Sequence, residues 1–200
     1  MTAGTEGYEK FISLFIKSSQ TLDFHKVCKD FIEHLPSKPA NILDAGSGAG
    51  QNAAALAMLG FTLTAIEPIS EFLNAAKTTY KNISVRWLSG SLPHLTCLSS
   101  DTELFDFVLI DGVWHHLDEI EREQTVIRLS AIIKKKGKCA ISLRSGPAGM
   151  GTRVYPTDAV LTIEKFKKYG FECILNLQNQ PSILSNKENV KWARLVLQRL

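Results

Sequence analysis

The sequence predicts an α/β fold in which helices cover both faces of a doubly wound, mostly parallel β-sheet. Strand-like and helix-like segments alternate along most of the chain, as they do in parallel sheets. The first strand-like segment runs directly into a glycine-rich turn that leads to a helix. With 200 residues, 44% of them hydrophobic, the chain can bury one sizeable core. We therefore expect a single domain over residues 1–200.

Amphipathic patterns at the N-terminus predict two helices, over residues 6–19 and 22–35. They would form a helical cap, residues 1–38, before a core, residues 39–200. In the core, apolar runs predict strands at 41–45, 62–66, 83–89, 105–111, 138–144, 171–177 and 190–200. Helical patterns between these runs predict helices at 51–59, 70–81, 118–136 and 157–169.

Residues that favour helix ends support these bounds. Asp118 is a good N-cap for the helix 118–136, and Glu119 and Glu121 suit the positive end of that helix. A glycine follows the expected end of three helices, where a left-handed backbone is common: Gly60, Gly137 and Gly170. These stops separate each helix from the strand after it.

Two lysine clusters are expected to be structural and not to bind nucleic acid. The first, 134–136, falls in the last turn of the predicted helix 118–136, where positive charge complements the negative end of the helix dipole. The second lies on the predicted solvated side of the helix 157–169, opposite Leu161 and Phe166, and consists of Lys165, Lys167 and Lys168. A net charge of +3 is also too small to indicate a nucleic-acid or membrane partner.

The cysteines and the N-terminus argue against several other classes. Cys28, Cys97, Cys139 and Cys173 stand far apart and form no C-x-x-C pair, so neither a metal site nor a redox motif is expected. The first residues lack the apolar core of a signal peptide, and no later segment is long enough to cross a bilayer. We expect an intracellular, cytoplasmic protein without a membrane partner. No sequence feature indicates an oligomeric state.

The turn after the first strand combines a carboxylate, Asp44, with three alternate glycines, Gly46, Gly48 and Gly50. Glycines let backbone N–H groups approach a ligand closely, and the next helix directs its positive end to the same place. Asp44 would repel a pyrophosphate and attract an ammonium or a sulfonium group. The expected ligand therefore carries positive charge.

The spacing of this turn departs from the dinucleotide-binding pattern. That pattern places its third glycine at the position of Gln51, whereas Gly50 comes two residues after Gly48. The strand 62–66 ends in Glu67, which is well placed to accept hydrogen bonds from both ribose hydroxyls of an adenosine. An adenosine ligand without a 2′-phosphate fits these residues, and an NAD-dependent oxidoreductase stays as an alternative.

With these motifs the chain resembles the class I S-adenosylmethionine-dependent methyltransferases. The segment 105–117, which ends in the letters HHL, is similar to the fourth strand and following turn of small-molecule members of that family. The resemblance implies a Rossmann-like, seven-stranded, mostly parallel sheet with an antiparallel last strand, its final hairpin formed by 171–177 and 190–200. It also implies S-adenosyl-L-methionine as the cofactor, bound by the core.

The resemblance places the cofactor at the carboxyl ends of the first four strands. The implied contacts are Asp44, Ala45, Gly46, Ser47, Gly48, Gly50, Glu67, Pro68, Ser91, Leu92, Asp111, Gly112 and Val113. Where the family usually offers an aspartate to the adenine amino group, this chain has Ser91, a weaker acceptor. Three adenine contacts stay open: the Ser91 side chain, the backbone around Leu92, or apolar packing by Ile69.

His115 and His116 follow the fourth strand, where the reactive methyl group should lie. Methyl transfer needs a positioned nucleophile and exclusion of water, and it needs a base only when the acceptor must lose a proton. Histidine titrates in the useful range, so either residue is a candidate base. The alternative is that the pair orients the loop by hydrogen bonds to the backbone. Trp114 either walls the site or fills the core.

Glycines and prolines between residues 144 and 156 predict a long loop that overhangs the pocket. Arg144 and Arg153 flank this loop and together would suit a carboxylate or phosphate on the substrate. The alternative is that both are solvated loop residues. Tyr155 offers an aromatic wall for a substrate. Two residues of the N-terminal helices are further candidates to face the pocket, Tyr8 and His25.

The leading functional hypothesis is an enzyme that transfers a methyl group to a small-molecule substrate, which would be an anion if Arg144 and Arg153 bind it. The HHL ending and the lack of room for a separate recognition domain favour it. The alternatives are an RNA or protein methyltransferase, or a cofactor-binding module without turnover. Asp111-Gly112-Val113-Trp114 replaces the Asn/Asp-Pro-Pro-aromatic box of adenine-specific DNA methyltransferases, which argues against that class.

Overall fold

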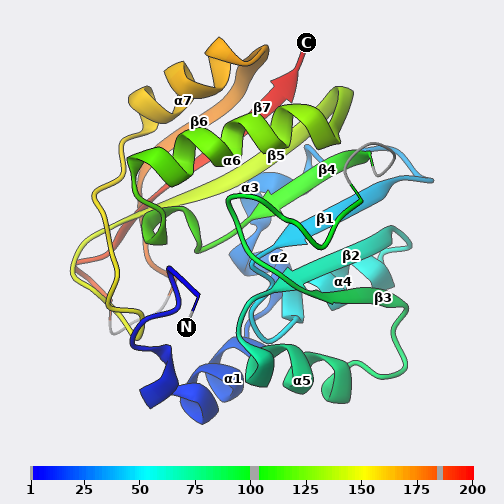
Figure 1. The fold of residues 1–200 in the computed structure, drawn as a ribbon, viewed down its shortest axis with the longest axis vertical. Helices are drawn as coiled ribbons and strands as arrows, with labels where there is room; N and C mark the ends of the chain where they lie inside the picture. Colours follow the sequence, from blue (N-terminus) through cyan, green and yellow to red (C-terminus); the bar gives the residue numbers. More distant parts are fainter. Residues whose placement is uncertain (1, 100–103, 184–186) are drawn as a thin grey trace.

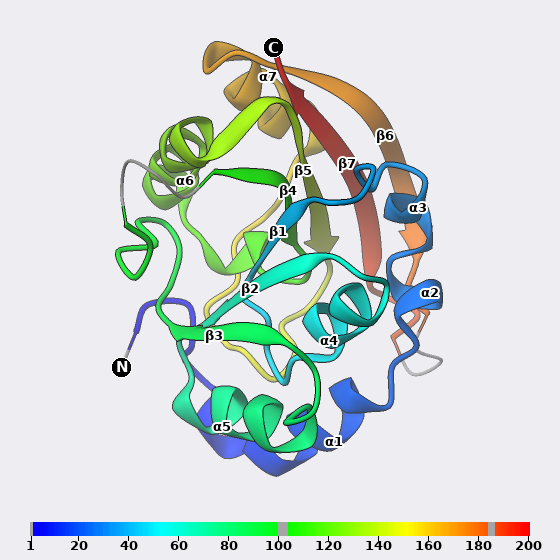
Figure 2. The ribbon, with the colours of Figure 1, turned by 90° about the vertical axis from the view of Figure 1, so that its right-hand side faces the viewer.

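The computed structural model describes residues 2–99, 104–183 and 187–200, which form one seven-stranded sheet with helices on both faces (Figures 1 and 2). Its strands are β1 (Asn41–Ala45), β2 (Thr62–Glu67), β3 (Val85–Ser89), β4 (Phe105–Ile110), β5 (Ile133–Ser145), β6 (Phe171–Pro181) and β7 (Lys191–Arg199). The order across the sheet is β3-β2-β1-β4-β5-β7-β6. Strands β1 to β5 pair in parallel, whereas β7 runs antiparallel to β5 and β6. The predicted fold and its final hairpin are confirmed.

Helices on the two faces of the sheet bury two separate apolar clusters. The longer helices are α4 (Gln51–Met58), α5 (Ser70–Thr79), α6 (Glu119–Ile132) and α7 (Ala159–Lys168). Figure 2 shows α6 and α7 on one face and α4 on the other. Neighbouring residues of β1 point to opposite faces, so Leu43 joins the cluster under α6 and α7 while Ile42 joins the other. Within the described ranges no helix has the length and apolar character that crossing a bilayer requires.

The N-terminal part is more broken than the sequence predicts. The segment 6–19 becomes the short 3-10 turn η1 (Tyr8–Lys10) and helix α1 (Ile12–Gln20). The segment 22–35 becomes α2 (Phe24–Val27) and α3 (Lys29–Ile32) instead of one helix. The break falls at Cys28, which is 1% exposed and whose backbone leaves the helical region at φ −103° and ψ 16°.

The predicted helix 118–136 ends early, because α6 stops at Ile132. Ile133 is fully buried in extended conformation and pairs with Phe105, which starts β5 at that residue. Lys134 then lies on the sheet, and its Nζ contacts both carboxylate oxygens of Asp106 at 2.9 Å. The expectation that residues 134–136 complement the dipole of a helix is therefore wrong, and Gly137 lies inside β5.

The predicted solvated face of α7 is also wrong for one residue. Lys165 is 9% exposed, whereas Leu161, expected on the apolar face, is 63% exposed. Lys165 reaches α6, where its Nζ lies 2.7 Å from Glu119 and 2.6 Å from Glu123. This pairing between α6 and α7 offsets the cost of burying the ammonium group.

Candidate active site

The turn between β1 and α4 requires glycine at two positions. Gly46 and Gly50 have φ values of +85° and +89°, which L side chains rarely adopt. A Cβ on Gly46 would lie 2.4 Å from the Val113 side chain, and one on Gly50 would lie 2.7 Å from Ala76. The backbone N–H groups of Gly46 and Ser47 both donate to Ile66, which fixes the turn against β2.

Glu67, the last residue of β2, completes this turn. Its carboxylate accepts hydrogen bonds from the backbone N–H of Gly48 at 2.8 Å and of Ile69 at 2.9 Å. The side chain is almost wholly buried, and burial raises the pKa of Glu67 to about 7 against the lowering effect of these two bonds. The carboxylate is thus held at the edge of the glycine turn, with an orientation fixed by backbone donors.

Asp44 is buried in surroundings that already contain other carboxylates. It is 1% exposed, and its Oδ2 atom has no hydrogen-bond partner among the residues that the structure describes. Burial, followed by the nearby Asp111 and Glu67, raises the pKa of Asp44 to about 8. Asp111 forms an ion pair with Arg194 at 3.0 Å. A buried carboxylate oxygen without a partner is what a cationic ligand would satisfy, so Asp44 fits the predicted ammonium contact.

A cavity opens at these strand ends and includes eight of the predicted cofactor-binding and catalytic residues: Gly46, Gly48, Glu67, Pro68, Ser91, Leu92, Val113 and His116. The remaining expected cofactor contacts belong to the same strand ends but do not line it: Asp44, Ala45, Ser47, Gly50, Asp111 and Gly112. Ile69 also lines the cavity. All three candidates for the adenine contact are therefore lining residues of this one cavity.

The N-terminal segment covers this cavity, which sequence reasoning foresaw only for Tyr8. Gly4, Tyr8 and Phe15 line it, and Phe15 stacks on Phe72 of α5 with ring centroids 4.3 Å apart. In Figure 1 the first residues, in blue, lie beside the yellow loop that follows β5. The backbone N–H of Thr152 in that loop donates to the Glu6 carbonyl at 2.8 Å. His25 is exposed and does not line the cavity.

His116 is held between the N-terminal segment and the loop after β5. Its Nδ1 lies 2.7 Å from the Arg153 carbonyl, and its Nε2 lies 3.0 Å from the Tyr8 hydroxyl. Because a carbonyl only accepts, Nδ1 carries the proton and Nε2 accepts from Tyr8. Burial lowers the pKa of His116, so the ring is neutral with one lone pair directed at Tyr8.

His115 and Trp114 differ from His116 in their surroundings. Burial, together with the neighbouring His116 and Arg144, lowers the pKa of His115 to about 2, which makes it a poor base. Trp114 is fully buried, packs near Phe166 and does not line the cavity. Of the two interpretations left open for Trp114, the structure therefore supports filling the core, and its proposed contact with substrate is corrected.

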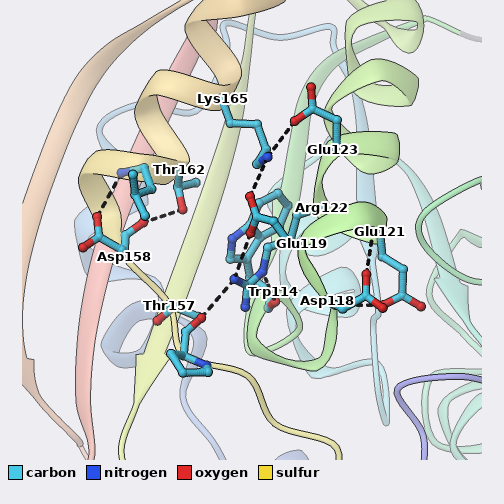
Figure 3. Close-up of polar contacts among 12 residues, drawn as sticks. Trp114, Asp118, Glu119, Glu121, Arg122, Glu123, Thr157, Asp158, Thr162 and Lys165 are labelled. Carbon is cyan, nitrogen blue, oxygen red and sulfur yellow. Dashed lines mark hydrogen bonds and ion pairs between the residues drawn. The ribbon is translucent and has the colours of Figure 1, made fainter.

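Arg122 of α6 anchors the turn that carries the histidines (Figure 3). Its Nε donates to the Trp114 carbonyl at 3.3 Å, and its Nη1 donates to the Pro156 carbonyl at 2.9 Å. Arg122 is 8% exposed, and its guanidinium pairs with Glu119 at 3.6 Å. One buried side chain thus connects η2 (Trp114–His116) with the far end of the loop after β5.

The two arginines that flank this loop do not converge. Arg153 pairs with Glu121 at 2.8 Å and Asp118 at 3.2 Å, and its guanidinium lies over the Tyr155 ring. Neither Arg153 nor Tyr155 lines a cavity next to the histidines. The structure therefore does not bring both arginines and Tyr155 to one cavity, because the Arg153 guanidinium is held by the acids at the start of α6 and by the His116 carbonyl. Arg144 is buried and lines a second cavity.

The second cavity encloses about 170 Å³ and lies next to the first. Tyr8, Phe15 and His116 line both cavities, so they form the wall between them. His115, Arg144 and Lys187 line the second cavity and not the first. Sequence reasoning missed Phe15 and Lys187, since neither stands in a motif and both are far in sequence from the strand ends.

Comparisons with known proteins agree with this arrangement. The family model described as a methyltransferase domain matches residues 43–141. This match, over about half of the chain, confirms the resemblance to the class I S-adenosylmethionine-dependent methyltransferases that the motifs predict.

A ubiquinone biosynthesis O-methyltransferase of Rickettsia akari is 31% identical over 119 residues, which is 58% of this chain and 44% of that protein. The match thus spans less than half of that relative. A 1,6-didemethyltoxoflavin-N1-methyltransferase of Burkholderia thailandensis, solved with its substrate and S-adenosylhomocysteine, has a TM-score of 0.72 at 16% identity, covering 96% of this chain and 86% of that one. A TehB-like methyltransferase of Corynebacterium glutamicum has a TM-score of 0.69 at 19% identity, covering 96% and 97%. These two similarities show the fold.

Proposed function

We propose that this protein transfers a methyl group from S-adenosyl-L-methionine, held in the first cavity, to a small molecule held in the second. The observation that carries this proposal is the shared wall of Tyr8, Phe15 and His116, which gives two adjoining cavities a common border. A donor and an acceptor in these cavities would meet at that border. The match to a methyltransferase-domain family supports the choice of donor.

The residues of the first cavity, and Asp44 at the strand end behind the glycine turn, suit the parts of this cofactor. Asp44 is the proposed partner of the ammonium group, and Glu67 is the proposed partner of the ribose hydroxyls. Ile69 and Leu92 offer apolar contacts to the adenine, and Ser91 offers it a hydroxyl. When bound, the cofactor supplies a methyl group already activated by its positively charged sulfur. The protein then has to position the acceptor and exclude water.

His116 is the proposed base for acceptors that must lose a proton. The Arg153 carbonyl accepts from Nδ1–H and fixes the ring. The Nε2 lone pair then points toward Tyr8, within the wall that separates the two cavities. The Tyr8 hydroxyl donates to this Nε2 atom at 3.0 Å, and the acceptor would replace it there. Burial raises the pKa of Tyr8 to about 12, so its hydroxyl stays protonated and serves as a donor.

The proposal is tested by incubating the protein with S-adenosyl-L-methionine and a panel of phenols, amines and thiols, and measuring S-adenosylhomocysteine. We expect turnover with at least one acceptor, and a His116→Asn variant that binds S-adenosylhomocysteine normally but turns over phenols more slowly. As a control, His94→Asn alters an exposed histidine outside both cavities and should leave turnover unchanged. Tight cofactor binding without turnover on any acceptor would favour a binding module instead.

A further inference from the structure

The second cavity brings two cationic side chains together without an acid. Arg144, from the end of β5, and Lys187, from the segment before β7, both line it. Among its described lining residues there is no aspartate or glutamate. The two cations are close enough that Arg144 lowers the pKa of Lys187, with burial as the larger cause. The cavity therefore concentrates positive charge.

Neither of these two cations is paired with an acid among the described residues. Arg144 is 7% exposed, and its guanidinium donates to the carbonyl oxygens of Gly146 and Pro147. Lys187 is half-buried, and its ammonium group forms no ion pair or hydrogen bond within the described part of the chain, although its backbone carbonyl accepts from Val190. Burying cations without a counter-ion costs free energy, which an anion entering the cavity would recover.

Other buried cations of this protein form ion pairs with acidic side chains. Ion pairs join Arg122 to Glu119, Lys165 to Glu119 and Glu123, and Arg194 to Asp111. These pairs lie away from the second cavity, where the chain instead leaves two cations facing open space. An uncompensated pair of cations in a cavity is the arrangement expected of an anion-binding site.

Large apolar side chains make up part of the remaining lining of the second cavity. Phe15, Leu22 and Met150 line the same cavity as the two cations. Arg144 and Lys187 line the second cavity alone, whereas Phe15 also borders the first. A molecule that satisfies this lining has an apolar body and an anionic oxygen group, and it places that group away from the border between the cavities.

We propose that Arg144 and Lys187 form an anion-binding subsite that selects methyl acceptors carrying a carboxylate or phosphate on an apolar body. This inference rests on the proposed function only in calling the bound anion a methyl acceptor. The subsite itself is a claim about binding and can be tested without methyl transfer. The sequence predicts that Arg144 and Arg153 together bind a carboxylate or phosphate of the substrate. In the proposed subsite Lys187 replaces Arg153.

Four probes with the same ring test the subsite: benzoate, phenyl phosphate, benzamide and benzylamine. Their dissociation constants are measured by NMR titration of the protein saturated with S-adenosylhomocysteine. We expect at least one anion to bind at least about tenfold more tightly than benzamide and benzylamine, the size of effect that one charge-assisted hydrogen bond gives. The better of the two anions identifies a carboxylate or a phosphate as the natural group.

Variants at Lys187 separate charge from folding, because its side chain is partly exposed. Lys187→Gln should weaken binding of the preferred anion by about tenfold and leave binding of benzamide unchanged. Lys187→Glu, which gives Arg144 an acidic neighbour, should abolish the preference for the anions. The matched control Lys191→Gln changes an exposed lysine that does not line the cavity and should have no effect.

The inference is overturned if neither anion binds more tightly than benzamide, or if Lys187→Gln binds anions as the natural protein does. These readouts need no turnover. Charge-selective binding without any methylated acceptor would therefore refute the proposed function and keep the subsite. Methylation of neutral acceptors with equal binding of all four probes would do the reverse.

Discussion

Protonation of Asp44 should control how tightly the protein holds S-adenosylhomocysteine, which carries the same ammonium group as the methyl donor. With a pKa of about 8, Asp44 is about 9% ionised at pH 7 and about 1% ionised at pH 6 without ligand. Since the ammonium selects the ionised carboxylate, affinity should fall close to tenfold between pH 7 and pH 6 from this group alone. Glu67, with a pKa of about 7, adds to the loss.

Isothermal titration calorimetry between pH 5.5 and 7 measures this effect, because an α-amino group stays protonated below its usual pKa of about 7.7. Plotted as log Kd against pH, Asp44→Asn should lose about one unit of slope and release about one proton fewer on binding. The control Asp158→Asn alters an exposed helix cap that asparagine also serves well, and its slope should match the natural protein. Equal slopes for Asp44→Asn and the natural protein would refute the electrostatic reasoning.

The same raised pKa bears on folding stability without ligand. Between the ordinary value of 3.8 and about 8, the folded protein holds one more proton on Asp44 than the unfolded chain does. The contribution of Asp44 to stability is therefore greatest at low pH and is lost as the pH rises through this window. Thermal unfolding of Asp44→Asn against the natural protein should show a stability difference that grows with pH.

Three further substitutions test the environment of His116. Tyr8→Phe removes the hydroxyl that stabilises neutral His116, so the acid limb of the pH–rate profile should move to higher pH, and an unchanged profile would contradict this. Gly151→Ala would place a Cβ 2.6 Å from Tyr8 and 2.7 Å from His116, so turnover should fall and stability should drop by about 1–3 kcal/mol. Gly149→Ala, with its nearest atom at 4.0 Å, should leave stability unchanged. Arg122→Met removes two hydrogen bonds and an ion pair, and denaturant unfolding should show a loss of about 3 kcal/mol that the exposed Lys167→Met does not show.

Much of the sheet could be predicted from the sequence because its signals are local. Apolar runs mark the parallel strands, and glycines such as Gly60 and Gly170 mark where helices end. The end of α6 could not be predicted in this way, since the lysines after Ile132 are good helix formers. Pairing of Ile133 with Phe105, and of Lys134 with Asp106, decides that boundary, and both contacts come from a distant strand.

In the candidate site too, residues with local sequence signals could be predicted, and residues placed by contacts from distant segments could not. Asp44, the glycines and Glu67 could be predicted because they stand at strand ends, where the fold gathers them. The outcome for Arg153 depended on the acids of α6, and that for Trp114 on whether the core needed its volume, which only three-dimensional packing decides. Phe15 and Lys187 reach the cavities from opposite ends of the chain, so no spacing in the sequence connects them.

A crystal structure with S-adenosylhomocysteine tests the central claim most directly, because it locates the sulfur from which the methyl group has left. We expect the ammonium beside Asp44, the ribose hydroxyls on Glu67, and the sulfur directed at the wall formed by Tyr8 and His116, with the second cavity beyond it. A sulfur directed away from that wall, or a ligand that leaves Glu67 uncontacted, would contradict the two-cavity account.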